Sequence, residues 1–588
     1  MTITTYPKTD AQPSSETAGA RQSSGWMRRL RYIEPSALLW VVLIAILVFL
    51  VVSPMARLLI ASFETRGTGA FTFSNYATAY GRERYVDALI RTLWLGAATA
   101  GLSALFAIPM AWAVSRTDMP GKKFTWTMVL GAFIIPPYLG AIGWILLAGP
   151  KGGWLNRMWM DMTGAEEGLV NIYTFWGLAL VIAINTFPFI FVFVKSALDL
   201  VSSEMEDAAN ILGAGTLTTT LKVTLPLVWP SILAGVILVF LETIALFGAP
   251  AIIAIPGRFN VVTTQLWQFF EAPVRMEVAA AYAMPLLLIT MGMMVVQKLM
   301  LSRKGYVSQT GKGGERRPVK LGPWRWVMFG WCALVGGIAV LLPLVVLIQA
   351  SFARAWGRGL SWDNITIRNY YYLLVENSSA QKAIVNTFLF AGSAAFLALG
   401  LALAIAYIVS RKLVPFSGAL AFLCMAPFVI PGIVMAIGFY AAYASPPLAL
   451  YGTATLMILA FTTRSLPIAY ANSAAGIRSI HPEMEEAVRI LGGNRLTAIK
   501  SVVAPLLKKS LLGGWLIVFI LATRELSAAI FLVGPNTRTI SVLLYDYSEE
   551  GNFEVLSAMG GILLVITLIF LAIGFRLVGR DFMLRRAN

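Results

Sequence analysis

The chain has 588 residues, of which 58% are hydrophobic and only 13% are charged, and its formal net charge is +17. So little charge over this length excludes an ordinary soluble globular protein and indicates a chain that lies largely in a lipid bilayer. The positive balance does not indicate a nucleic-acid-binding protein, because the basic residues gather in short clusters between apolar runs.

Twelve apolar runs of about 20 residues or more follow one another along the chain, each long enough to span a bilayer. Buried helices of a large globular protein would show polar faces at helical spacing, which most of these runs lack. We therefore expect an all-α integral membrane protein with about twelve transmembrane helices. The expected spans are 33–62, 86–116, 124–148, 172–198, 226–253, 276–302, 324–351, 381–410, 415–443, 448–475, 507–532 and 555–578.

The basic clusters predict how the chain is oriented in the membrane. With twelve spans they all fall on one side together with both termini, which places that side in the cytoplasm. Residues 1–32 are polar and lack the apolar core of a cleaved signal, so we expect a cytoplasmic tail there and another at 579–588. The clusters lie near 28–31, 122–123, 303–320, 411–412 and 576–586.

The second half of the chain repeats the first. The segment EMEDAANILGAGTLTTTLKVTLP (Glu204–Pro226) returns as EMEEAVRILGGNRLTAIKSVVAP (Glu483–Pro505), displaced by 279 positions. Shorter matches are displaced by 289 to 295 positions, among them Ala61-Ser62-Phe63 with Ala350-Ser351-Phe352, Asn75-Tyr76 with Asn369-Tyr370, and Ser115-Arg116 with Ser410-Arg411.

Each half therefore holds six spans, and an even number of crossings makes the halves parallel repeats about an axis along the membrane normal. We expect one half at 33–302 and the other at 324–578. Residues 303–323 between them are rich in glycine and basic residues, which predicts a flexible cytoplasmic linker.

The long repeated segment predicts a short amphipathic helix, a glycine turn and a second short helix on the cytoplasmic face of each half. Gly213 and Gly492 end the first helices, where a positive φ is commonly needed, and Pro226 and Pro505 open the next spans. A helix lying on the lipid surface is the alternative, but such helices normally carry basic polar faces and these carry acidic ones. We interpret the two segments as docking elements for two copies of a cytoplasmic partner.

The spacing Asp/Glu-Ala-Ala/Val-x3-Gly-x9-Val-x-x-Pro resembles the EAA motif of the permease subunits of binding-protein-dependent ABC importers. Asp207 stands where the family has Glu, and Val488 where it has the second Ala. The residues that the resemblance assigns to coupling with the ATPase are Glu206, Asp207, Ala208, Ala209, Gly213, Pro226, Glu485, Glu486, Ala487, Val488, Gly492 and Pro505.

The resemblance implies a type I importer unit in a bacterial inner membrane, with two permease halves fused in one chain. It further implies two copies of a cytoplasmic ABC ATPase and a periplasmic substrate-binding protein as partners. The stretches Ala111–Lys123 and Ile480–Gly493 look most like the ferric-iron-type permeases. Thiamine, polyamine and phosphonate permeases have similar stretches, so the cargo stays open.

The chain lacks the sequence GxxxxGK[ST], and no catalytic constellation of side chains stands out. We therefore expect a transport subunit that is not an enzyme and binds no cofactor, with ATP and magnesium held by a separate ATPase. One histidine, His481, and two cysteines, Cys332 and Cys424, cannot build a soft-metal site alone.

Ionisable residues inside spans are costly and usually face an interior or a pathway. Glu242, Arg464, Arg524 and Glu525 are the main cases. They either line the translocation path or form a structural intramembrane ion pair, and the sequence leaves both open. Two other classes also stay in view: a secondary carrier driven by an ion gradient, and a membrane-embedded enzyme or scaffold.

Overall fold

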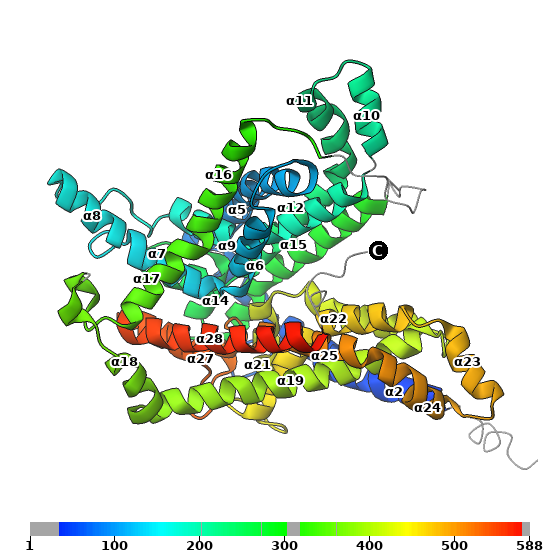
Figure 1. Ribbon diagram of the computed structural model, residues 1–588. Helices are drawn as coiled ribbons and strands as arrows, with labels where there is room; N and C mark the ends of the chain where they lie inside the picture. The colour runs from blue at the N-terminus through cyan, green and yellow to red at the C-terminus, as the bar shows by residue number, and fades with distance from the viewer. Residues whose placement is uncertain (1–34, 202, 272, 303–317, 360, 579–588) are drawn as a thin grey trace, which may run out of the picture.

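The computed structural model describes residues 35–201, 203–271, 273–302, 318–359 and 361–578, and the elements named there are all helices (Figure 1). Ten continuous helices in these ranges are long and apolar enough to cross a membrane, and two bent pairs bring the number to twelve if each pair is one span. The expected class and the count of about twelve are confirmed, whereas the side on which each terminus lies stays a prediction. The ten are Leu38–Ser62, Glu83–Arg116, Phe175–Leu200, Thr216–Ala245, Met276–Met300, Trp324–Ser351, Ser378–Ser410, Ala454–Arg478, Arg495–Thr523 and Phe553–Gly574.

The third span of each half is broken. The helices α6 (Lys122–Ile134) and α7 (Pro137–Ala148) meet at 102°. In the second half, α20 (Ser417–Met425) and the short turn after it meet α21 (Gly432–Tyr443) at 110°. The prolines inside the spans expected over 124–148 and 415–443 were expected to mark kinks, but each of these spans is two separate helices. A proline with extended ψ of 139°, Pro136 or Pro431, stands at each break and supplies no N–H to the helix.

A five-residue π-helical segment precedes a proline in four spans. The residue just before each proline donates its N–H to the carbonyl five residues back, as Leu225 does to Thr220. This wider turn removes the carbonyl that would collide with the proline ring, so the helix continues. The four segments are Val48–Val52 before Pro54, Thr220–Thr224 before Pro226, Gly337–Leu341 before Pro343, and Ile499–Val503 before Pro505.

The second helix of each repeated segment is consequently continuous with a span. In the first half α11 (Thr216–Thr219) runs through the π-helical segment into α12 (Leu225–Ala245). In the second half α24 (Arg495–Ala498) runs likewise into α25 (Ala504–Thr523). Pro226 and Pro505 thus stand in the first turns of α12 and α25, as expected, but the short helix before each proline runs on into the span.

The same three spans form the centre of each half. In the first half α5 (Glu83–Arg116) packs against α9 (Phe175–Leu200) and α12. In the second half α19 (Ser378–Ser410) packs against α22 (Ala454–Arg478) and α25. Buried alanines at helical spacing on α19 let its backbone approach its neighbours closely, which is how membrane helices associate without a hydrophobic driving force.

The first span of each half packs against the other half. The helices α2 (Pro35–Leu47) and α3 (Ser53–Ser62) contact α19, α20 and α21, and in Figure 1 the blue α2 lies among the second-half helices. Reciprocally, α16 (Trp324–Gly336) contacts α5 and α6, and α17 (Leu342–Ser351) contacts α7. The two halves thus interlock through an exchange of their first spans.

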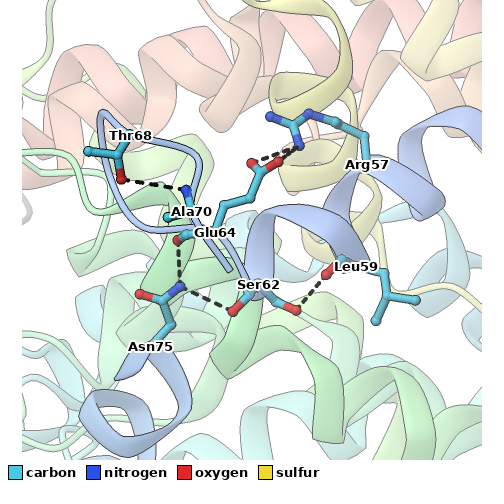
Figure 2. A network of polar contacts seen from close by, with 7 residues as sticks. All are labelled: Arg57, Leu59, Ser62, Glu64, Thr68, Ala70 and Asn75. Carbon is cyan, nitrogen blue, oxygen red and sulfur yellow. Dashed lines mark hydrogen bonds and ion pairs between the residues drawn. The ribbon is translucent and has the colours of Figure 1, made fainter. Parts of the chain in front are cut away.

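Figure 2 shows how the loop after α3 is held. The side-chain amide of Asn75 donates to the carbonyl oxygens of Ser62 at 3.1 Å and Glu64 at 2.8 Å, and Arg57 donates to both carboxylate oxygens of Glu64 at 2.7 Å. In the second half, Asn369 donates in the same way to the carbonyls of Ser351 and Ala353. In each half, the asparagine of the repeated Asn-Tyr sequence therefore holds the loop that follows the repeated Ala-Ser-Phe sequence.

Further helices connect these spans, among them the short helical turns Trp356–Arg358, Trp362–Asn364 and Tyr372–Glu376. Further α-helices are α4 (Ser74–Tyr80), α8 (Trp154–Thr163), α13 (Gly248–Ile253), α14 (Val262–Gln268), α15 (Met276–Ser302), α18 (Arg368–Tyr371), α26 (Ala529–Leu532), α27 (Ile540–Glu549) and α28 (Phe553–Val578).

Candidate functional site

Two helical hairpins project from the helix bundle, one from each half (Figure 1). The first is made by α10 (Ser203–Ile211) and α11, the second by α23 (Pro482–Ile490) and α24. Gly213 (φ +85°) and Gly492 (φ +87°) turn the chain between the helices of each pair in the left-handed conformation that side chains disfavour.

The tip of each hairpin exposes two large apolar side chains. Ile211 and Leu212 are 85% and 87% exposed, and Ile490 and Leu491 repeat these values at the second tip. Among the predicted coupling residues, Glu486, Ala208 and Ala487 are also exposed, whereas Asp207, Ala209 and Val488 are half-buried. An exposed apolar patch at matched places in both halves is the pattern of a surface that another protein covers.

Glu206 and Glu485, predicted as coupling residues, point back into the bundle. Each is buried and forms an ion pair with an arginine at the end of the second span of its own half. Arg116 Nη2 lies 3.3 Å from Glu206 Oε1, and Arg411 Nη2 lies 2.6 Å from Glu485 Oε1. These two glutamates are therefore turned away from a partner docked on the exposed face of the hairpin.

Hydroxyl groups complete both ion pairs. Thr224 Oγ1 donates to Glu206 at 2.7 Å, and the Tyr407 hydroxyl donates to Glu485 at 2.7 Å. Sequence reasoning missed the arginines as functional partners, although the repeated Ser-Arg pairs at 115–116 and 410–411 were a usable signal.

The end of the linker is held at the same place. Val319 donates its N–H to the carbonyl of Arg116 at 2.8 Å, and Asp118 donates its N–H to the carbonyl of Val319 at 3.1 Å. The Asp118 carboxylate accepts the N–H of Leu321 at 2.9 Å. Residues 318–321 of the expected flexible linker are thus fixed, while 303–317 lie outside the described residues.

The four ionisable residues predicted within spans gather around one cavity of about 370 Å³ between the halves. Glu242 comes from α12 of the first half, and Arg464, Arg524 and Glu525 come from the second half. Phe133 and Tyr138 of the broken span and Phe461 of α22 line the cavity between them. The cavity is therefore built by both halves and has a mixed polar and aromatic wall.

Both arginines bind backbone carbonyls at the breaks of the third spans. Arg524 Nη1 donates to the carbonyl of Phe133 at 2.6 Å, across the boundary between the halves. Arg464 Nη1 donates to the carbonyls of Ile430 at 3.1 Å and Pro427 at 3.4 Å. A helix that stops inside a membrane leaves carbonyls without partners, and these guanidinium groups supply the missing donors.

The sequence matches the family model described as "Binding-protein-dependent transport system inner membrane component" twice, over residues 97–306 and 397–582. Each match contains one hairpin, the first central span of its half from residue 97 or 397 onward, and the other two central spans in full.

Curated relatives cover most of the chain. It is 27% identical over 542 residues to the ferric transport system permease protein FbpB of Actinobacillus pleuropneumoniae, which covers 89% of this chain and 75% of the relative. It is also 27% identical over 518 residues to the putative ferric transport system permease protein FbpB 1 of Haemophilus influenzae, covering 85% of this chain and 78% of that one. The sulfate transport system permease protein CysW of Synechococcus elongatus is 26% identical over 294 residues, or 49% of this chain and 97% of CysW.

Among solved structures, a bacterial ABC transporter involved in the import of the acidic polysaccharide alginate matches 48% of this chain and 100% of its own, with 18% identity and a TM-score of 0.38.

Proposed function

The chain belongs to the binding-protein-dependent transport system inner membrane components, and we propose that it is the permease of an ATP-driven importer of ferric iron. It is a multi-pass membrane permease of an ABC transport system. The ferric transport relatives, each matched over more than four fifths of this chain, support iron as the cargo. The family also favours an ATP-driven importer over a carrier driven by an ion gradient.

The two hairpins are the proposed docking sites for two copies of a cytoplasmic ABC ATPase, which binds ATP and magnesium. The observation that carries this proposal is the matched pair of exposed tips, Ile211-Leu212 and Ile490-Leu491. Removing one such side chain from water contributes about 1.5–3 kcal/mol, so each tip offers a sizeable apolar anchor. Asp207 and Glu486 at the sides of the hairpins supply carboxylates for basic residues of the ATPase.

The opposite face of the protein is the proposed landing surface for a periplasmic substrate-binding protein. The helix α8 projects at the end of the molecule away from both hairpins (Figure 1) and exposes Met158 and Met162. If the hairpins are cytoplasmic, as the basic clusters predict, α8 lies in the periplasm.

The cavity between the halves is the proposed position of the translocation path. Its charged side chains belong to both halves, so a relative movement of the halves changes the cavity and its access. The arginine bonds to the Phe133 and Ile430 carbonyls hold the two breaks against this cavity. Alternating access then follows from shifting the broken spans relative to α12 and α25.

The test is to co-express the chain with its ABC ATPase and to purify the complex. Proteoliposomes with the cognate binding protein should take up ferric iron only with ATP inside, and loaded binding protein should stimulate hydrolysis. Absence of any bound ATPase would refute the importer proposal. Stimulated ATP hydrolysis without iron uptake would be consistent with an ATP-driven importer but would refute ferric iron as its cargo.

A second cargo class, small oxyanions, is favoured by the two guanidinium groups at the cavity, Arg464 and Arg524. Guanidinium groups bind oxyanions with paired hydrogen bonds and repel bare metal cations. Parallel uptake measurements with sulfate, phosphonate, thiamine and a polyamine in the same vesicles would decide between these cargoes and iron.

A further inference from the structure

We propose that the two buried arginine–glutamate pairs, Arg116–Glu206 and Arg411–Glu485, are latches that transmit the movement of each hairpin to the second span of its half. This inference rests on the proposed function, because it assigns a mechanical role to the point where the ATPase would push. The arginines are positioning residues, and nothing in the motif itself marks them.

Each latch joins elements that the chain does not connect directly. The first hairpin follows α9 and leads into α12, whereas Arg116 is the last residue of α5. The second hairpin follows α22 and leads into α25, whereas Arg411 directly follows α19. Without the latches, a displaced hairpin would pull only on the spans to which it is covalently attached.

Each arginine binds the hairpin region at two points. Besides its glutamate, Arg116 Nη2 donates to the carbonyl of Val201 at 3.0 Å, and Arg411 Nη2 donates to the carbonyl of Ile480 at 3.1 Å. These carbonyls correspond to one another, 279 positions apart, and lie just before α10 and α23. Two anchor points fix the orientation of the hairpin relative to the second span as well as its distance.

Burial makes these bonds resistant to displacement. The side-chain exposures are 4% and 11% in the first pair and 12% and 10% in the second. The neighbouring pair of His481 and Glu483 is 3.4 Å apart and 69% and 80% exposed. Exposed pairs contribute little, whereas breaking a buried pair leaves an uncompensated charge, so only the buried pairs can carry force.

The second spans lead to the cavity. The helix α19 packs along α22, which carries Arg464, and α5 packs along α9 and α12, which carries Glu242. A shift of α19 or α5 therefore moves the helices that form the cavity wall. A movement of the hairpin thus reaches the cavity wall in two ways: through the spans that are covalently attached to the hairpin, and through the latch and the second span.

The experiment measures coupling in proteoliposomes that hold the full chain, its ATPase and its binding protein. The readout is the ATP hydrolysis rate with loaded binding protein divided by the rate without it, alongside the amount of co-purified ATPase. Glu485→Gln should lower this ratio by about 5-fold or more, with the ATPase still bound in the wild-type amount. Arg411→Lys keeps the charge but loses the second guanidinium bond to Glu485, which Arg411 Nε donates at 2.8 Å, and should give an intermediate ratio.

Glu376→Gln is the matched control, because it makes the same change in an arginine–glutamate pair outside both hairpins, Arg368–Glu376, whose side chains are 63% and 35% exposed, and it should leave the ratio unchanged. A merely structural role would lower assembly or thermal stability and leave the ratio of the assembled complex intact. A wild-type ratio in Glu485→Gln, or a loss of bound ATPase in step with the loss of stimulation, would overturn the latch alone. A wild-type complex without bound ATPase or stimulation would overturn the proposed function and the latch with it.

Discussion

Asn185 and Arg464 occupy corresponding positions on α9 and α22, 279 residues apart, yet only Arg464 brings a charge to the cavity. Asn185 instead donates to the carbonyl of Val181 within its own helix at 2.8 Å. Arg524 likewise brings a charge to the cavity, whereas its counterpart in the first half, 279 residues earlier, is the uncharged Ala245. The two halves share a fold, but the charges that face the cavity are not duplicated.

Replacing Arg464 by the residue of the other half tests this asymmetry. Arg464→Asn removes the bonds to the carbonyls of Pro427 and Ile430, and each hydrogen bond to a charged group is worth about 1.5–3 kcal/mol. We expect iron uptake to fall about tenfold or more in proteoliposomes, with assembly preserved. Arg478→Asn, at an exposed site in the last turn of the same helix, is the control. Wild-type uptake in Arg464→Asn would exclude a role in transport.

Polar substitution of a hairpin tip should weaken ATPase docking. The double variant Ile490→Ser/Leu491→Ser removes two anchors worth about 1.5–3 kcal/mol each, so the dissociation constant should rise on the order of 100-fold or more. Binding of the ATPase to the detergent-solubilised protein measures it. Leu448→Ser, at a 45% exposed leucine between α21 and α22, should leave binding unchanged. Equal affinities of wild type and double variant would refute the docking assignment.

The turn glycine should be sensitive to backbone preference and insensitive to side-chain size. A Cβ atom at Gly492 would meet nothing within 4 Å, so the strain comes only from its φ of +87°. Valine in this conformation costs about 1–2 kcal/mol, whereas asparagine tolerates it. Gly492→Val should therefore impair stimulated hydrolysis and Gly492→Asn should retain most of it. Equal impairment by both variants would point to a contact at Gly492 in place of strain.

The interface between the halves should be disrupted by a single methyl group. A Cβ atom at Gly438 would lie 2.6 Å from Met55 Cε and 2.9 Å from the Pro54 carbonyl oxygen, in the opposite half. With residues 1–310 and 311–588 expressed as separate chains, Gly438→Ala should reduce their co-purification. Gly400→Ala is the control, because a Cβ atom there would meet nothing within 4 Å. Undiminished co-purification would contradict this prediction and show that Met55 and the Pro54 backbone can shift to make room for the methyl group.

The predicted orientation can be tested with reporters that are active only in the periplasm. Fusions after Lys122, Lys312 and Arg586 should be inactive, because the basic clusters hold these segments in the cytoplasm. A fusion after Gly164, beyond α8, should be active. Activity at Lys312 would contradict the arrangement of two parallel halves of six spans each.

The sequence predicted the class, the duplication and the position of the hairpins, because apolar runs and a repeated polar segment are local signals. It did not predict that Glu206 faces inward and Asp207 is only half-buried, since neighbouring acidic residues look alike until the buried Arg116 is known. The sharp breaks at Pro136 and Pro431 were expected only as kinks. How far a proline bends a span depends on which groups donate hydrogen bonds to the carbonyls that the break leaves without partners. Those donors, Arg464 and Arg524, belong to other spans than the broken ones.

The packing of α2 was beyond sequence reasoning for another reason. A helix that is apolar on every side carries no periodicity that would select its partner. Nothing in Pro35–Leu47 distinguishes a neighbour in its own half from one in the other half.

The exchange of first spans also sets a schedule for biosynthesis. The helix α2 ends at Leu47, but α20, on which it packs, ends at Met425, which leaves 378 residues still to be made. At about 5–20 residues per second the ribosome needs roughly 20 to 75 s for that stretch, so the first helix waits in lipid without its final neighbour. Apart from Ser36 at its start and the indole N–H of Trp40, which has no hydrogen-bond partner even in the folded protein, α2 carries no polar side-chain group, so its wait in lipid costs little. A chain that ends before α20 would leave α2 without this packing partner, so we expect such truncated chains to be degraded in the membrane.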